Sequence, residues 1–216
     1  MYNAVYIVMN DHKEIWSGVF QLKSVFQKFS ENLSCLTALK TAREMDLQPL
    51  FDAVSEKRAS LLSLVNPVAN ITLAYANDHK KKELIKKLKL SIKKLTISND
   101  LDLIDDSKVI HKVAKKLIKK SVSETEEPDN KSVSIVDYGL NEKMIIDLNT
   151  AKNDFVKSLL ALHEATQSKV IMGKQITSIL KKNERLLKNK MDLLVSIFAT
   201  SKTNFYKTYL EARVIQ

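Results

Sequence analysis

The sequence predicts an all-α protein, a helical bundle of long amphipathic helices with two shorter basic helices. The chain has 216 residues, 44% hydrophobic and 28% charged, which is typical of a globular protein. It contains only three Gly and three Pro. Sheets joined by tight turns need many residues that accept positive φ, whereas a few long helices need almost none. Apolar residues also recur at steps of three and four along most of the chain, which indicates helices.

The N-terminal part predicts three helices. Residues 2–14 form a short one, and Trp16-Ser17-Gly18 follows as a turn. A second runs over 19–46, and a third over 50–76 with Pro49 in its first turn. Pro67 lies inside the third helix, which predicts either a kink near Leu64 to Asn66 or a break into two helices.

Two amphipathic basic helices are predicted next, at 80–95 and 107–120. Each helix has one apolar face, and lysines occupy the rest. The apolar face contains Leu84, Ile85, Leu88, Ile92 and Leu95 in the first helix, and Val109, Ile110, Val113, Ala114, Leu117 and Ile118 in the second. Ser107 is the predicted N-cap of the second helix, and the acidic stretch 97–106 is a predicted connector.

The C-terminal part begins with a linker, because residues 121–134 have turn-forming composition and little to bury. Tyr138-Gly139-Leu140 predicts a turn with Gly at positive φ, and Asn141 then caps a helix. Apolar residues at near-heptad spacing over 145–197 predict either one long helix or a hairpin broken near Met172-Gly173. A last helix follows Thr200-Ser201, which places the helical region at 141–213.

We therefore expect an N-terminal half at 1–120, a linker at 121–137 and long C-terminal helices at 138–216 that pack on the first half as one combined domain. Phe198, Phe205, Tyr206 and Tyr209 are expected to pack and to fasten the last helix, with a peptide- or ligand-binding groove as the alternative. Arg213 is expected to complement the carbonyl end of its helix, with a specific salt bridge as the alternative.

Three short motifs and the C-terminal tail carry a resemblance. They are Trp16-Ser17-Gly18, Leu88-Lys89-Leu90-Ser91, Tyr138-Gly139-Leu140, then Leu186-Leu187-x-x-x-Met191-Asp192-x-Leu194-Val195-x-x-Phe198 and Phe205-Tyr206-x-x-Tyr209-x-x-Ala212-Arg213-x-Ile215. On these residues the chain resembles an uncharacterised family of all-helical bacterial proteins of about this length. The resemblance implies a helical fold and no known activity. Members of the family contain fewer lysines in the middle of the chain, so the resemblance implies nothing about the lysines of residues 79–120.

The sequence contains no catalytic constellation, and we expect a protein that is not an enzyme and holds no cofactor or metal. None of the four histidines lies four residues from another, so each is predicted to be a surface or capping residue. The aspartates of 100–106 lack the Gly and Glu of a calcium loop, because those positions hold Asp105 and His111. Cys35 has no basic neighbour within three positions and is predicted to be a buried small hydrophobe.

Nearly all the net charge lies in one segment. Residues 79–120 carry fourteen lysines and five acids, a net +9 of the +10 of the whole chain. An anion should therefore meet this segment first. Because the segment contains no Arg, Phe, Tyr or Trp, it lacks the usual groups for base reading and stacking. The candidate polyanion-binding residues are Lys80, Lys81, Lys82, Lys86, Lys87, Lys93, Lys94, Lys112, Lys115, Lys116, Lys119 and Lys120.

Several interpretations of these lysines stay open. They form a solvated face of two core-packed helices, or a site for nonspecific nucleic acid or another polyanion, or a surface for an anionic membrane or an acidic protein. The leading hypothesis for function is a non-enzymatic helical interaction or scaffold protein with an unknown protein partner, and the alternative is a polyanion-binding module using 79–120. Self-association through 145–197 is a third hypothesis. No transmembrane segment is expected, and the single cysteine fits a cytoplasmic protein.

Overall fold

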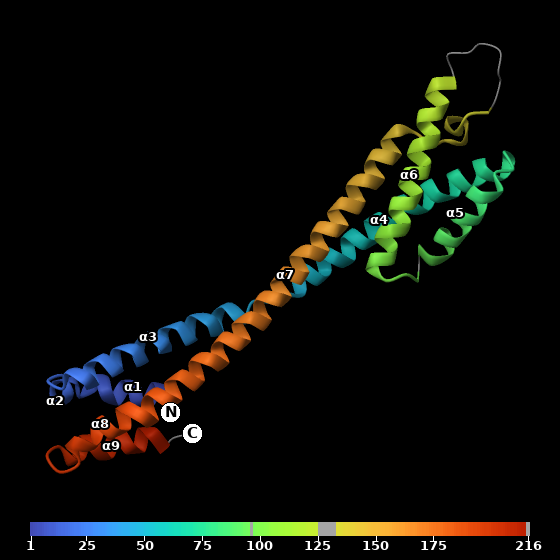
Figure 1. The fold of residues 1–216 in the computed structure, drawn as a ribbon. Helices are drawn as coiled ribbons and strands as arrows, with labels where there is room; N and C mark the ends of the chain where they lie inside the picture. Colours follow the sequence, from blue (N-terminus) through green and yellow to red (C-terminus); the bar gives the residue numbers. More distant parts are fainter. Residues whose placement is uncertain (96, 125–132, 215–216) are drawn as a thin grey trace. The chain divides into compact units, whose positions relative to one another are not determined.

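The protein is helical throughout the part that the structure, a computed structural model, describes. Residues 1–95, 97–124 and 133–214 are described, and they form helices and no strands. The all-α prediction is confirmed (Figure 1). The helices are α1 (Tyr2–Asp11), α2 (Lys13–Trp16), α3 (Phe20–Arg43), α4 (Gln48–Asp78), α5 (Lys82–Leu95), α6 (Asp100–Glu124), α7 (Glu142–Leu186), α8 (Asp192–Val195) and α9 (Thr203–Val214). Short 3-10 segments occupy Ile135–Tyr138 and Ser196–Phe198, and a π-helical turn occupies Leu187–Met191.

The chain folds as two compact units. Unit 1 consists of Met1–Asp46 and Thr166–Gln216, and unit 2 consists of Leu47–Ala165. This grouping differs from the sequence-based division into 1–120 and 138–216. Residues 125–132 of the predicted linker at 121–137 lie outside the described residues. In the rest of it, α6 continues to Glu124 and a 3-10 turn begins at Ile135.

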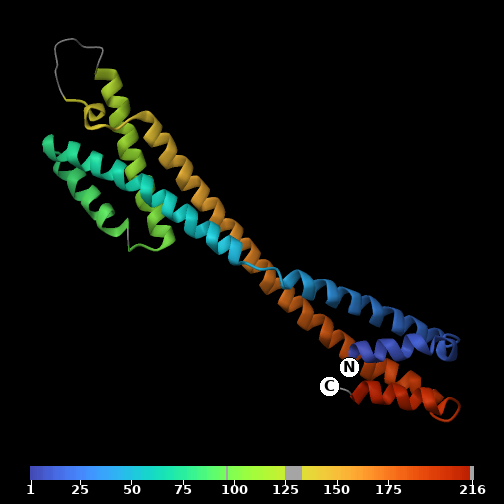
Figure 2. The same ribbon diagram turned by 180° about the vertical axis from the view of Figure 1, so that it is seen from behind.

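In unit 1 the two ends of the chain pack together, as Figures 1 and 2 show for α1, α3, α8 and α9. The core contains Val5, Met9, Trp16, Leu22 and Phe29 from the N-terminal helices, packed with residues of 187–212. The predicted packing of the C-terminal aromatic residues is confirmed: Phe205 and Tyr209 are buried, and the ring centroids of Phe198 and Phe205 are 5.6 Å apart.

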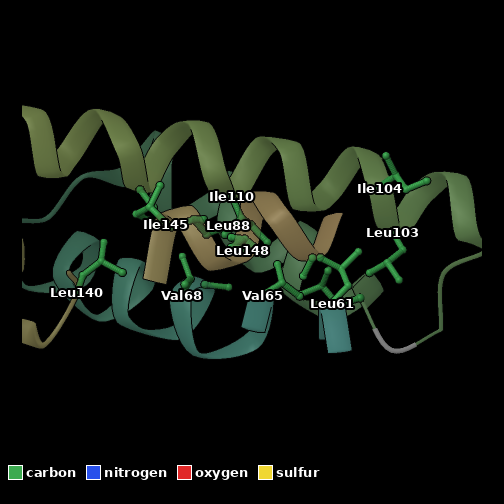
Figure 3. Close-up of a cluster of buried hydrophobic side chains, with 14 of the residues drawn as sticks. Leu61, Val65, Val68, Leu88, Leu103, Ile104, Ile110, Leu140, Ile145 and Leu148 are labelled. Atoms are coloured by element: carbon green, nitrogen blue, oxygen red, sulfur yellow. The ribbon is translucent and has the colours of Figure 1, made fainter. Parts of the chain in front are cut away.

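In unit 2, α4, α5, α6 and the first part of α7 share a second core. Figure 3 shows Leu61, Val65, Val68, Leu88, Ile110 and Leu148 gathered between these helices. The predicted apolar faces of the two basic helices supply Leu88, Leu95, Ile110 and Ala114, all of them fully buried. Those faces are therefore used for folding and leave the lysines of α5 and α6 toward solvent.

The predicted start of the second basic helix is wrong. The helix begins at Asp100, so the supposed connector 97–106 is largely helical. Asn99 is the N-cap, because its Oδ1 accepts the backbone N–H of Asp102 at 2.9 Å. Ser107 is instead buried inside the helix and donates to the carbonyl oxygen of Leu103 at 2.6 Å. Aspartates in the first turn suit the positive end of the helix dipole, which explains why they continue the helix.

The turn before α7 is as predicted. Gly139 has φ 89, and the side chain of Asn141 accepts the backbone N–H of Met144 at 2.9 Å. Of the two predictions for 145–197, the structure has the long helix, since α7 runs through Gly173 without a break.

Pro67 does not break α4, which is one helix from Gln48 to Asp78. One stretch among the described residues, Phe20–Asp78, contains a window of mean hydropathy 1.3 that could cross a membrane by length and composition. Core helices of soluble proteins have the same composition, and 39% of that window is buried within the protein. The absence of a transmembrane segment stays a prediction.

Cys35 is exposed, so the prediction that it is a buried hydrophobe is wrong. The buried positions of α3 are Leu22, Val25, Phe29 and Leu36. Cys35 precedes Leu36 by one residue and is therefore rotated by about 100° away from that buried stripe.

Candidate anion-binding surface

The basic helices α5 and α6 form an antiparallel pair in unit 2. Ser91 Oγ of α5 donates to Asp106 Oδ1 of α6 at 2.8 Å, which ties the two helices near their connection. The connection itself is held to α4, because the Arg58 guanidinium donates to Asp100 Oδ1 at 3.0 Å and to the carbonyl oxygen of Ser98 at 2.6 Å. These contacts fix the backbone that carries the lysines.

The structure places the predicted lysines on the outside of this pair. All twelve candidates except Lys81 are exposed, and Lys81 is half-buried. Lys81 Nζ donates to the hydroxyl of Tyr75 at 3.2 Å and lies 4.4 Å from the centroid of the Tyr75 ring. This cation–π contact holds one lysine in place at the start of α5.

A groove of about 680 Å³ lies between α5 and α6 and brings five of the candidate lysines together. Its walls contain Lys81, Lys86 and Lys87 from the α5 side and Lys116 and Lys120 from α6. Apolar side chains lie between them: Leu84, Leu90, Val113 and Leu117. The groove therefore combines an apolar floor with a cationic rim.

The other candidates are not part of the groove. Lys115 and Lys119 line a smaller cavity of about 190 Å³ together with His111 and residues of α7. The remaining five candidates line neither cavity: Lys80, Lys82, Lys93, Lys94 and Lys112. Five of the candidates thus gather in the groove and two line the smaller cavity.

Leu90 is a feature of the groove that sequence reasoning missed. It lies outside the predicted apolar face of α5, and its exposed fraction is 56%. A leucine among lysines on the solvent side of a strongly amphipathic helix was the available signal. Val113 and Leu117 were predicted to face the core, and they are half-buried with part of their surface in the groove.

Positive charge also accumulates between α6 and α7. The pKa of His111 is lowered by burial first and by Lys152 and Lys115 second. Burial likewise lowers the pKa of Lys152, with Lys108 and Lys112 adding to the effect. An ion pair does join Lys108 to Asp105, with Nζ and Oδ1 2.9 Å apart on the surface of α6. Burial is thus the first cause of both lowered pKa values, and the neighbouring lysines add to it.

The histidines do not come together into a site. His12 and His79 are at the C-caps of α1 and α4, and His79 packs against Tyr75 with ring centroids 4.0 Å apart. His111 is half-buried and His163 is exposed. In the described ranges no group of three or more His, Cys, Asp or Glu side chains could hold a metal ion.

Comparison of the chain with protein-family profiles, curated proteins and solved structures gives no match. The resemblance to an all-helical bacterial family therefore stays a prediction.

Proposed function

We propose that this chain is a non-enzymatic interaction protein that binds an anionic macromolecule through the lysine-rich face of α5 and α6. The observation that carries the proposal is the groove, where five lysines surround an apolar floor and Glu83 is the one acid among the described lining residues. A merely solvated lysine face needs no such concave site. Cytoplasmic location is part of the proposal and rests on the single cysteine.

The composition of the face favours binding without sequence selectivity. Lysine is a point charge that contacts phosphates or carboxylates, whereas base reading and stacking use Arg and aromatic side chains. Residues 79–120 contain neither, so phosphate and carboxylate polymers should both bind. The apolar faces of both helices are buried in the core of unit 2, which argues against insertion of these helices into a membrane surface.

Self-association through 145–197 has less support. The periodic residues Ile145, Leu148 and Phe155 are buried in the core of unit 2, and Leu187 is buried in unit 1. A coiled coil with a second chain through the same positions would have to expose these side chains first. The scaffold hypothesis then requires an unidentified protein partner that binds another surface of the chain.

The test uses a labelled mixed-sequence DNA duplex and labelled polyglutamate as probes, with anisotropy measured at about 50 and about 200 mM salt. We expect micromolar binding at low salt that falls by orders of magnitude at high salt, because each charge contact releases counterions. Replacement of Lys80, Lys81, Lys82, Lys86 and Lys87 by Gln should weaken binding. The matched control replaces five exposed lysines of unit 1, namely Lys174, Lys181, Lys182, Lys188 and Lys190. Absence of binding at low salt, or equal loss in both variants, would refute the proposal.

A further inference from the structure

We infer that the groove between α5 and α6 binds an acidic amphipathic helix of a partner protein. This inference rests on the proposed function and names its ligand class. The groove has an apolar floor and a cationic rim. The ligand must complement both, and this requirement indicates its class.

The shape of the groove suits a helix. On α6 the lining residues are Val113, Lys116, Leu117 and Lys120, which follow the i, i+3, i+4, i+7 spacing of one helix face. On α5 the lining residues Glu83, Lys87 and Leu90 follow i, i+4, i+7. Each lining set spans about two turns, roughly 10 Å, and a helix of similar length is the kind of ligand that binds in a groove between two helices.

The apolar floor of the groove is complemented by an apolar surface on the ligand. Leu90 projects at an exposed fraction of 56%, and Leu84 and Leu117 are only partly covered by the core of unit 2. Leucines on one face of a docking helix would remove this apolar area from water. A nucleic-acid backbone offers the floor no comparable apolar contact, and a flat bilayer surface does not enter a concave groove.

The cationic rim is complemented by negative charge beside the apolar face of the ligand. Lys81, Lys86 and Lys87 on one wall and Lys116 and Lys120 on the other lie where glutamates flanking the apolar stripe of a docked helix would reach. Lys81 is already positioned by Tyr75, so less side-chain freedom is lost on binding. A helix with a leucine stripe and glutamates on both sides complements the groove in shape, polarity and charge.

The experiment compares three labelled probes on the full chain at about 100 mM salt, where nonspecific contacts are weakened. The first is a designed peptide of Leu and Glu with leucines at i, i+3, i+4 and i+7. The second is a scramble of the same composition whose leucines do not share a face, and the third is the DNA duplex. We expect the amphipathic peptide to bind at least about tenfold more tightly than its scramble, as expected for leucines that are buried on binding.

The variant Leu90→Gln tests the apolar contact of the groove without changing any of its lysines. Because Leu90 is exposed, the substitution should leave the fold intact and cut binding of the amphipathic peptide about tenfold, a larger loss than that of DNA binding. Leu101→Gln is the matched control, since Leu101 is 73% exposed on α6 and does not line the groove. Equal binding of peptide and scramble, or no effect of Leu90→Gln, overturns this inference and leaves the proposed function standing. Absence of binding for all three probes, at about 50 mM salt as well, overturns both.

Discussion

Arg213, in the last turn of α9, holds Asp192 through a two-pronged ion pair. Arg213 Nε lies 2.9 Å from Asp192 Oδ1, and Arg213 Nη2 lies 3.0 Å from Asp192 Oδ2. The hydroxyl of Tyr209 donates to the same carboxylate, and burial together with this hydrogen bond raises the pKa of Tyr209 above its ordinary value. The structure therefore has the specific salt bridge considered for Arg213, which also lies in the last turn of α9 as predicted.

Replacement of Asp192 by Asn should destabilise unit 1. The side chains of Arg213 and Asp192 are 14% and 29% exposed, so losing the carboxylate leaves a partly buried guanidinium with a weakened partner. We expect a loss of roughly 1–3 kcal/mol in the free energy of unfolding. Glu184, whose Oε1 is 3.7 Å from Arg213 Nη2, keeps the loss from being larger.

Urea denaturation of the parent and of Asp192→Asn measures this difference in the free energy of unfolding. Asp105→Asn is the control, because it removes the exposed ion pair with Lys108 and should leave the midpoint unchanged. A stability of Asp192→Asn equal to that of the parent would show that the two-pronged pair contributes nothing.

His111 should make stability depend on pH below neutrality. Burial, with Lys152 and Lys115, lowers the pKa of His111 in the folded chain below its value in the unfolded chain. The stabilisation is then fully present above the unfolded pKa of about 6.5 and is lost as the pH falls through the folded pKa.

Urea midpoints at about pH 7.5 and about pH 5 test this dependence. The midpoint of the parent should fall more steeply between them than that of His111→Gln. The exposed His163 provides the control, and His163→Gln should follow the parent. Identical slopes for His111→Gln and the parent would exclude the effect.

Gly173 should accept alanine with a gain in stability. It lies inside α7, and a Cβ placed there would be 3.6 Å from Cζ of Arg43, an ordinary contact. Gly173→Ala should therefore raise the free energy of unfolding by up to about 1 kcal/mol. Gly139→Ala is the opposite case, because Gly139 has a positive φ of 89°. This substitution should lower the free energy of unfolding by about 1 kcal/mol. Thermal or urea unfolding checks both, and a loss at Gly173 would contradict the prediction.

Cys35 should react in the native state. It is exposed on α3, so one thiol per chain should be titrated by a disulfide reagent without denaturant. The Cys35→Ser variant sets the background of the assay. Reaction that appears only after unfolding would contradict the exposed position.

Sequence reasoning was most successful where periodicity and capping act locally. The helix at 19–46 corresponds to α3, that at 50–76 to α4, and Gly139 and Asn141 occupy the predicted turn and cap. It failed at the start of α6, because aspartates were interpreted as a connector although the first turn of a helix favours them.

Other features depend on contacts that periodicity does not contain. The pattern of α5 shows Leu90 among lysines on the solvent side, but Leu90 lines a groove only because α6 lies beside α5, and the pattern does not contain that neighbour. The two units likewise follow from contacts between distant residues, such as the hydroxyl of Tyr2 with the carbonyl oxygen of Leu180 at 3.2 Å. The side chains of Asn32 and Asn183 meet in the same way, at 2.7 Å.

The interleaved order of the two units has a consequence for synthesis on the ribosome. The core of unit 1 combines residues of Met1–Asp46 with residues of Thr166–Gln216, so the first helices emerge long before this core can close. At roughly 5–20 residues per second, the interval is on the order of ten seconds. During that interval Trp16, Phe29 and their neighbours have no completed core to enter, while Leu47–Ala165 can already fold. We therefore expect the N-terminal helices to wait longest during synthesis for the residues that complete their core.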